Sequence, residues 1–210
     1  MRPRLTTLKL PSLRRALLRL HADLFAVINA APIYVSEQTL DDLEILVLLL
    51  EDRRFYTHFG VDYLSVIREL WRASTLRKHG GASTIDMQLV RTATGYKAHT
   101  LRRKVYEMLL AYLLNFKYRK IEILRLYLDR AFFGSGLIGI NQASQGLYGR
   151  HPSDLNFDEK ALLAAMLVYP KPRSPEIEWT RKVRRRADYA KPLFSTYEKR
   201  FKEIPSGELI

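Results

Sequence analysis

An unbroken apolar run, Ile45 to Leu50, is the feature that most restricts how this chain of 210 residues can fold. Residues 40–51 together fit a helix that is apolar on all sides, and a helix of that kind is buried in a core. The run ends in Glu51, which precedes a loop that contains His58 and Gly60. A buried carboxylate costs free energy unless it is paired or has a chemical task. Glu51 is therefore the first candidate for a catalytic residue.

Apolar residues at helical spacing recur along the rest of the chain, whereas the alternating pattern of a β-strand is scarce. The segment 63–71 has a single apolar face, and Asp62 is well placed to cap a helix there. Helices are also expected over residues 13–28, 84–91, 105–113, 121–133, 141–148 and 156–167. The sequence thus predicts a mainly α protein with a basic, amphipathic arm (1–34), a main domain (35–190) and a basic tail (191–210).

The charge balance favours anionic partners. The chain has 35 Lys and Arg against 22 Asp and Glu, a net charge of +13. Such a surplus suits nucleic acid, a phospholipid surface or a pyrophosphate-bearing substrate, although a merely solubilising surface explains it equally well. The chain has no cysteine, which excludes disulfides and thiolate metal sites.

The N-terminal arm is the segment with the strongest membrane character. It has neither the roughly 18 to 20 consecutive apolar residues of a membrane span nor a clear signal peptide. Its basic, amphipathic helix over 13–28 fits two interpretations, a helix lying on a membrane surface or a helix packed on the protein's own core.

A second carboxylate of interest is Glu107. Arg103 precedes it by four residues and Lys104 by three, so all three side chains share one face of a helix. The apolar stripe of that helix, which includes Val105 and Leu109, is expected on the other side. An exposed ion pair worth a few tenths of a kcal/mol is therefore the simpler interpretation.

A glycine-rich turn leads into a helix over residues 80–91. The hydroxyls of Ser83 and Thr84 would lie at the N-terminus of that helix, where a phosphate is favoured. The alternative is a capping box formed by Ser83 and Asp86. The spacing of a nucleotide-binding P-loop is absent.

In chain order, these segments resemble the five motifs of the family 51 glycosyltransferases, the peptidoglycan glycosyltransferases or transglycosylases. The first motif, E-D-x-x-F-x-x-H-x-G, is matched in full by Glu51, Asp52, Phe55, His58 and Gly60. The second, G-x-S-T-I-T-Q-Q-L-V-K-N, is matched at Gly81, Ser83, Thr84, Ile85, Gln88, Leu89 and Val90. The third, R-K-x-x-E, is matched by Arg103, Lys104 and Glu107.

The last two motifs match less specific segments. An I-L-x-x-Y-L-N helix with its glycine loop resembles residues 123–149, and an A-L-L-A helix before a proline-rich turn resembles 161–175. The chain departs from the usual residues at Asp86, Met87, Arg91, Thr92 and Asp129. Several of these departures lie in the second, donor-side motif, so they bear on substrate details and activity.

The resemblance implies a lysozyme-like, two-lobed helical domain with a cleft. The implied reaction is glycan-strand polymerisation from lipid II, with undecaprenyl pyrophosphate as the leaving group, by a monofunctional enzyme. Glu51 would be the general base, and Glu107 would orient the neighbouring cations or help to hold a divalent ion, Mg or Mn, beside the diphosphate. The implied substrate- and pyrophosphate-binding residues are Asp52, Phe55, His58, Ser83, Thr84, Gln88, Arg91, Arg103 and Lys104.

The implied partners are lipid II, the lipid-linked glycan strand, an anionic membrane surface and other cell-wall synthesis proteins. The family's place of action implies a peripheral position on the outer face of the cell membrane. The apolar face of 63–71 would contact the membrane there, or would simply pack in the core. Two other functions stay open, a lysozyme-like enzyme that cleaves glycans and a non-catalytic protein that binds lipid II or a membrane surface. Nucleic-acid binding rests on charge alone and is the weakest alternative.

Overall fold

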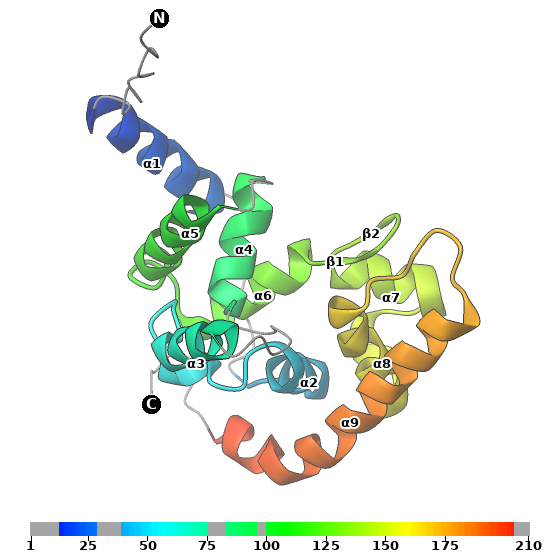
Figure 1. The fold of residues 1–210 in the computed structure, drawn as a ribbon. Helices are drawn as coiled ribbons and strands as arrows, with labels where there is room; N and C mark the ends of the chain where they lie inside the picture. The colour runs from blue at the N-terminus through cyan, green and yellow to red at the C-terminus, as the bar shows by residue number, and fades with distance from the viewer. Residues whose placement is uncertain (1–12, 29–38, 75–82, 96–99, 204–210) are drawn as a thin grey trace, which may run out of the picture.

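A computed structural model describes residues 13–28, 39–74, 83–95 and 100–203, and its regular structure is almost entirely helical (Figure 1). The helices are α1 (Leu13–Ile28), α2 (Asp42–Glu51), α3 (Tyr63–Ser74), α4 (Ile85–Thr94), α5 (Leu101–Leu114), α6 (Lys120–Arg130), α7 (Ile140–Tyr148), α8 (Phe157–Val168) and α9 (Ile177–Lys202). Short 3-10 turns span Phe55–Thr57 and Pro152–Asp154. The mainly α fold predicted from the sequence is confirmed.

The strand content is a single small hairpin within the described residues. Strands β1 (Phe132–Gly134) and β2 (Leu137–Ile138) pair in antiparallel fashion between α6 and α7. Gly134 also bridges to Lys171 in the proline-rich turn after α8. Its φ is +149°, and a Cβ atom at this position would lie 2.5 Å from the Lys171 carbonyl oxygen. A glycine is therefore needed where the hairpin and the turn meet.

Helix α2 is the centre of the core. A capping box starts it, because the Glu44 N–H donates to Asp41 Oδ1 at 2.7 Å and the Asp41 N–H donates to Glu44 Oε2 at 3.0 Å. Every residue from Leu43 to Leu50 is buried. Full burial of each such aliphatic side chain stabilises the fold by about 1.5–3 kcal/mol. The helix can therefore hold its last residue, Glu51, in a fixed position.

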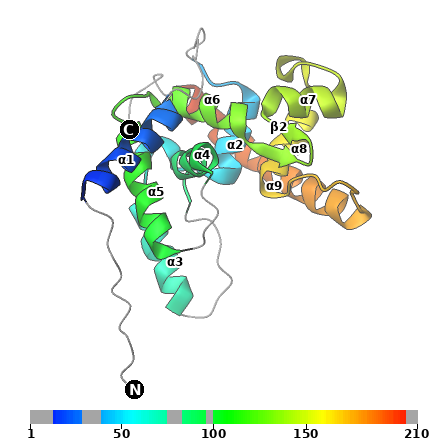
Figure 2. The ribbon, with the colours of Figure 1, turned by 90° about the horizontal axis from the view of Figure 1, so that it is seen from above.

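The other helices pack around α2 and α4 (Figures 1 and 2). Helices α8 and α9 contact α2 and each other, whereas α5 and α6 contact α4. Helix α9 curves along the outside of α2 and α8 and continues through residue 190, where the sequence suggested that a tail begins. Phe194 and Phe201, beyond that point, are buried against the core. The last third of α9 is thus part of the packed structure.

Helix α1 packs on α4 and α5. Leu20 and Leu24 lie against the core, and the Tyr106 hydroxyl of α5 donates a 2.9 Å hydrogen bond to Asp23. Of the two interpretations of this helix, packing on the protein's own core is the one observed for its described side chains. Leu18 and Phe25 are exposed on its outer face. Residues 1–12 of the predicted arm and 204–210 of the predicted tail lie outside the described residues.

Among the described residues, none of the helices has both the length and the apolar content that crossing a bilayer requires.

Candidate active site

Glu51 lies at the C-terminal end of α2, where a helix dipole disfavours negative charge. Burial raises the pKa of its carboxyl above the ordinary value of 4.5. A hydrogen bond from Gln88 and the charges of Arg186 and Arg91 oppose this rise, while the charge of Asp52 adds to it. A carboxylate whose pKa is shifted toward neutrality in this way is suited to accept a proton.

Gln88 connects Glu51, at the end of α2, to Tyr127 on α6. Its Nε2 donates a 2.9 Å hydrogen bond to Glu51 Oε2, and its Oε1 accepts a 3.0 Å bond from the Tyr127 hydroxyl. Tyr127 is buried on α6, and burial raises the pKa of its hydroxyl well above 10.0. Tyr127 therefore remains a proton donor, and it fixes which end of the Gln88 amide faces the carboxylate.

The first two motifs are connected within the core by three buried side chains, those of Asp52, His58 and Thr84. Asp52 Oδ2 lies 3.0 Å from His58 Nε2 and accepts a 3.1 Å hydrogen bond from the Ile85 N–H at the start of α4. The Thr84 hydroxyl donates to the Gly60 carbonyl at 2.7 Å and accepts from the Met87 N–H as the N-cap of α4. These side chains are buried, so they hold the loop after Glu51 against α4.

Gly60 allows that loop to pass close to α5. Its φ is +82°, and a Cβ atom built on it would lie 2.5 Å from the Ala111 carbonyl oxygen. A larger residue would be strained in its backbone and would collide with α5. The glycine of the first motif thus has a steric reason to be there.

Phe55 was expected among the substrate-binding residues, but its side chain is fully buried. The Lys120 Nζ lies 4.5 Å from the centre of its ring. A ring without exposed surface supports the site from the core and does not reach a substrate in this conformation.

The alternative interpretation of this turn, a capping box formed by Ser83 and Asp86, is wrong, because Thr84 and not Ser83 is the N-cap, and Asp86 is buried. Asp86 has no exposed surface and lies 3.1 Å from Lys120 Nζ, with Asn115 donating a further 2.7 Å hydrogen bond. Met87 is buried as well. Two of the four unusual residues of the second motif, Asp86 and Met87, are therefore packed in the core, whereas Gln88, which matches the family, bonds to Glu51.

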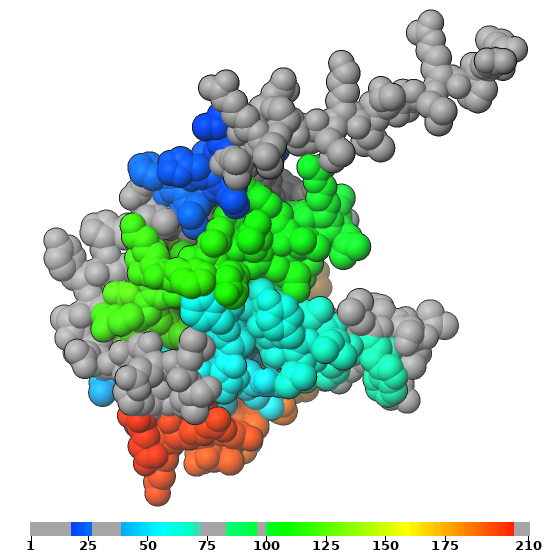
Figure 3. Space-filling view, turned by 90° about the vertical axis from the view of Figure 1, so that its left-hand side faces the viewer, coloured from blue at the N-terminus to red at the C-terminus, as the bar shows by residue number. Residues whose placement is uncertain are grey.

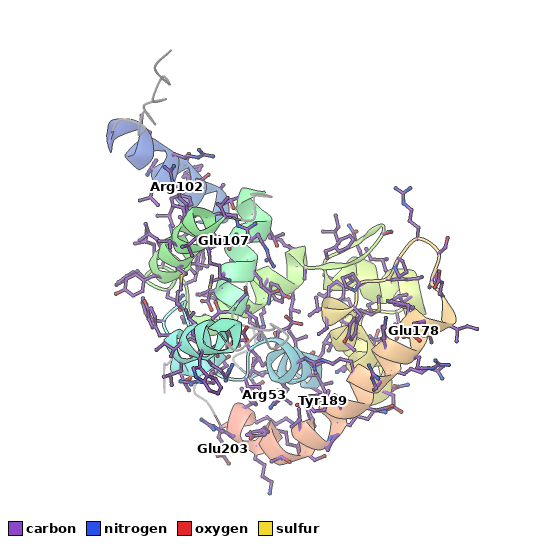
Figure 4. The ribbon with its side chains drawn as sticks, in the orientation of Figure 1. Arg53, Arg102, Glu107, Glu178, Tyr189 and Glu203 are labelled. Carbon is purple, nitrogen blue, oxygen red and sulfur yellow. The ribbon has the colours of Figure 1, made fainter. Side chains whose placement is uncertain are left out.

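The simpler interpretation of Glu107, an exposed ion pair, is wrong. Glu107 is 2% exposed, and its Oε1 lies 3.2 Å from Arg103 Nε, in a side chain that is itself 13% exposed. Figure 4 shows Glu107 on the side of α5 that faces α4. Conversely, two residues of the apolar stripe expected in the core, Val105 and Leu109, are exposed.

Lys104 and Ser83 connect the second and third motifs. The Lys104 Nζ donates a 2.7 Å hydrogen bond to Ser83 Oγ. Burial lowers the pKa of the Lys104 ammonium, and the neighbouring Glu107 charge partly restores it. The Ser83 hydroxyl and the Lys104 ammonium therefore lie next to each other, where both can donate hydrogen bonds to an anionic oxygen.

Arg91 links this basic group electrostatically to Glu51. It follows Gln88 by three residues on α4, and its charge acts on both Glu51 and Lys104. Its side chain is exposed, so it is accessible to a substrate. One face of α4 therefore carries a hydrogen-bond donor for Glu51 and a cation near Lys104.

An open pocket of about 350 Å³ joins the ends of the first two motifs. Glu51, Asp52, Ser83 and Thr84 line it, together with Ser65 and Arg68 from the start of α3. Arg68 donates a 2.9 Å hydrogen bond to Ser65 Oγ, whose own proton is donated to Asp62. Asp62 caps α3 as the sequence predicts, because it also accepts a bond from the Ser65 N–H.

Arg68 and Arg186 are among the residues near the site that the sequence did not indicate. The Arg186 guanidinium of α9 donates a 2.9 Å hydrogen bond to the Leu50 carbonyl and lowers the pKa of Glu51. It belongs to the run R-R-R at 184–186, in which no spacing rule separates one arginine from its neighbours.

A divalent ion at Glu107 would need ligands beyond those that the described residues supply. Glu107 contacts cations, and it belongs to no described group of three potential metal ligands. One such group exists elsewhere, formed by Asp52, His58 and Asp86. There the Lys120 ammonium already neutralises Asp86, so an ion would have to displace a buried salt bridge.

Comparison with known proteins identifies the class to which this fold and site belong. Residues 29–192 match the sequence model of the Transglycosylase family. The chain therefore belongs to the transglycosylase family, as its five motifs predict.

Individual relatives agree with that assignment. The chain is 37% identical over 139 residues to penicillin-binding protein 1A of Aquifex aeolicus, a match that covers 65% of this chain and 19% of that protein. It is 36% identical over 138 residues to penicillin-binding protein 2a of Streptococcus pneumoniae, covering 64% and 18%. It is 35% identical over 143 residues to a Cupriavidus necator protein named as a transglycosylase, covering 68% and 62%. The matches thus span about a fifth of each penicillin-binding protein and less than two thirds of the third relative.

Proposed function

We propose that this protein polymerises peptidoglycan glycan strands from lipid II and releases undecaprenyl pyrophosphate. The observation that carries the proposal is the placement of Glu51. It is a carboxylate with a raised pKa, held by Gln88, and Arg91 connects it electrostatically to the cationic group around Lys104. Deprotonation of a hydroxyl and departure of a diphosphate require these two kinds of group side by side.

In the proposed reaction, the 4-hydroxyl oxygen of lipid II forms a bond to the anomeric carbon of the lipid-linked strand. Its proton passes to a carboxylate oxygen of Glu51. The bond from the anomeric carbon to the diphosphate oxygen breaks, and its electron pair leaves with undecaprenyl pyrophosphate. The negative charge that develops there is stabilised best by donors that are already oriented before the reaction.

The donors proposed for this task are held by neighbouring side chains. Lys104 is bonded to Ser83, and Arg103 is paired with the buried Glu107. Glu107 therefore acts here by orienting Arg103. A divalent ion, if one takes part, would neutralise charge on the diphosphate and would have Glu107 as its nearest carboxylate in this basic group.

The departures from the second motif are compatible with activity. Asp86 and Met87 pack in the core, and Asp86 is neutralised by Lys120. Arg91 keeps a positive charge where the family usually has lysine. Asp86, Met87 and Arg91 thus leave the hydrogen bond of Gln88 to Glu51 and the positive charge at position 91 in place.

A glycan-cleaving enzyme is favoured less by the same geometry. A glycosidase uses two carboxylates that flank one bond. Here the second candidate, Glu107, is 2% exposed and bound to Arg103. Glu107 is therefore not an accessible second carboxylate for a lysozyme-like cleavage.

The lipid part of the substrate and a membrane surface suit the exposed apolar faces of α3 and α5. Tyr63, Ile67 and Trp71 of α3 are each more than 60% exposed, which argues against the core packing that the sequence left open. Leu70 of the same predicted face lies among side chains that are not described. Figure 3 shows α1, α5 and α3 along one side of the molecule. We infer a peripheral position on the outer face of the cell membrane, with this side against the lipid.

A lipid II polymerisation assay tests the proposal. Wild-type protein in detergent is expected to lengthen glycan chains, and Glu51→Gln to lower the rate about 10²- to 10⁴-fold, because the base is lost. Glu178→Gln, on an exposed part of α9 (Figure 4), is the matched control and should be fully active. Soluble muropeptides released from purified cell wall would instead indicate a hydrolase. Tight lipid II binding by a folded protein without turnover would indicate a non-catalytic binder.

A further inference from the structure

A second, smaller pocket of about 160 Å³ adjoins the site on the side of α9. Leu49 and Phe201, both buried, form its apolar walls. Arg53 and Arg54 enter it from the loop after Glu51, and Arg200 enters it from the end of α9. The proposed reaction uses none of these three arginines.

The positive charge in this pocket is poorly compensated. Arg53 donates to two neutral oxygens, the Leu49 carbonyl and the Tyr189 hydroxyl, and it faces α9 in Figure 4. Arg54 Nε lies 3.7 Å from a carboxylate oxygen of Asp62. Within the part of the chain that the structure describes, Arg200 has neither an ion pair nor a hydrogen bond, and the pocket lining includes no Asp or Glu.

Guanidinium groups gathered around one small space repel one another; solvent screens part of this repulsion at the exposed Arg53 and Arg200, and an anion that enters the space would turn it into attraction. A volume of 160 Å³ is the share of roughly five water molecules in the liquid, and it is below the about 300 Å³ at which ordinary ligand pockets begin. The occupant is therefore a small anionic group and not a whole nucleotide or sugar chain.

We propose that this pocket is a binding site for a phosphate group, held by Arg53, Arg54 and Arg200. Guanidinium forks match phosphate oxygens in geometry, and a tetrahedral phosphate can accept from donors that arrive from several directions. Since Arg53 and Arg54 follow Glu51 by two and three residues and Arg200 lies on α9, a bound phosphate would tie α9 to the segment that carries the proposed base. The proposal goes beyond the proposed function, because it requires no glycan reaction.

Calorimetric titration of the full chain with inorganic phosphate at constant ionic strength tests the site. Wild-type protein is expected to show saturable binding, and Arg200→Gln to weaken it about tenfold, the usual loss for one charge-assisted hydrogen bond. Arg200→Lys should lie in between, because it keeps the charge without the fork. Lys199→Gln is the matched control, since Lys199 is the exposed neighbour on α9 and does not line the pocket. Thermal unfolding without phosphate checks that each variant folds.

Vesicles separate the two sources of a phosphate group. If a lipid headgroup is the occupant, Arg200→Gln will bind phosphatidylglycerol vesicles more weakly than Lys199→Gln, and inorganic phosphate will compete with the vesicles. If free phosphate is the occupant, the two variants will bind vesicles equally while their phosphate affinities still differ. The proposal is overturned if wild-type protein shows no saturable phosphate binding, or if Arg200→Gln and Lys199→Gln weaken it to the same extent.

Discussion

Gln88 donates a 2.9 Å hydrogen bond from its Nε2 to Glu51 Oε2, and this contact joins helix α4 to the end of helix α2. An amide N–H binds an ionised carboxylate more strongly than a protonated one. The bond therefore favours the charged form of Glu51, whereas burial favours the neutral form. The pKa of the proposed base is set by the balance of these two effects.

Replacing Gln88 by methionine should move the acid limb of the pH–rate profile to higher pH. The substitution removes a donor that lowers the pKa of Glu51, so the pKa rises further above 4.5 and the base form is populated only at higher pH. At a fixed pH on that limb, the initial rate of glycan polymerisation should fall. Tyr127→Phe, which loses only the bond to the far end of the amide, should shift the limb less. An unchanged limb in Gln88→Met would contradict the role given to this hydrogen bond.

Arg186 should affect the acid limb of the same pH–rate profile through its positive charge. Its charge lowers the pKa of Glu51, so Arg186→Gln is expected to raise that pKa and to move the acid limb upward. Arg186→Lys should restore much of the effect, because the positive charge is kept. The exposed neighbour Arg185 supplies the control, Arg185→Gln, which should leave the profile in place. Equal shifts in both glutamine variants would point to a general effect of net charge and not to a specific one on Glu51.

The sequence predicted the helices well because apolar periodicity reports local structure directly. It predicted the burial of α2 for the same reason, since every position in that run is apolar. The orientation of α5 was wrong. Leu110, Ala111 and Leu114 form a second apolar face on this helix, and periodicity alone cannot decide which of two apolar faces meets the core.

The sequence predicted which residues form the candidate site, but it did not predict which of them contact one another. Motif order brought Glu51, Gln88 and Lys104 onto one list, but the partners of each depend on contacts between distant segments. Arg186 and Leu50, for example, are 136 positions apart, and no local pattern connects them. Likewise, nothing in the second motif indicated that Asp86 faces Lys120 in the core and not the substrate.

The buried pair of Asp86 and Lys120 should be strongly coupled. Lys120→Met is expected to lower the free energy of unfolding by about 3–5 kcal/mol. The reason is that the fully buried carboxylate of Asp86 would lose its positively charged partner. The double variant Asp86→Thr with Lys120→Met should recover part of this loss, since no unpaired charge remains. Urea unfolding measures both. The exposed pair of Glu178 and Arg181 is the reference, and Glu178→Gln should change the free energy by less than about 1 kcal/mol. Additive effects of the two core substitutions would show that the pair is not coupled.

The apolar face of α3 should determine how strongly the protein binds lipid. Ile67 is 61% exposed, and its transfer into the interfacial part of a bilayer is worth about 1.5–3 kcal/mol if the side chain is fully buried there. Ile67→Ser is therefore expected to weaken binding to phosphatidylglycerol vesicles about tenfold in a sedimentation assay. Ile177→Ser is matched in chemistry and removes an even more exposed isoleucine, at the start of α9 and away from α3 and α5 (Figure 1). It should leave vesicle binding unchanged, because Ile177 lies outside the apolar surface of α1, α3 and α5 that is proposed to enter the membrane. Equal losses in the two variants would mean that hydrophobic exposure in general, and not this face, governs the interaction.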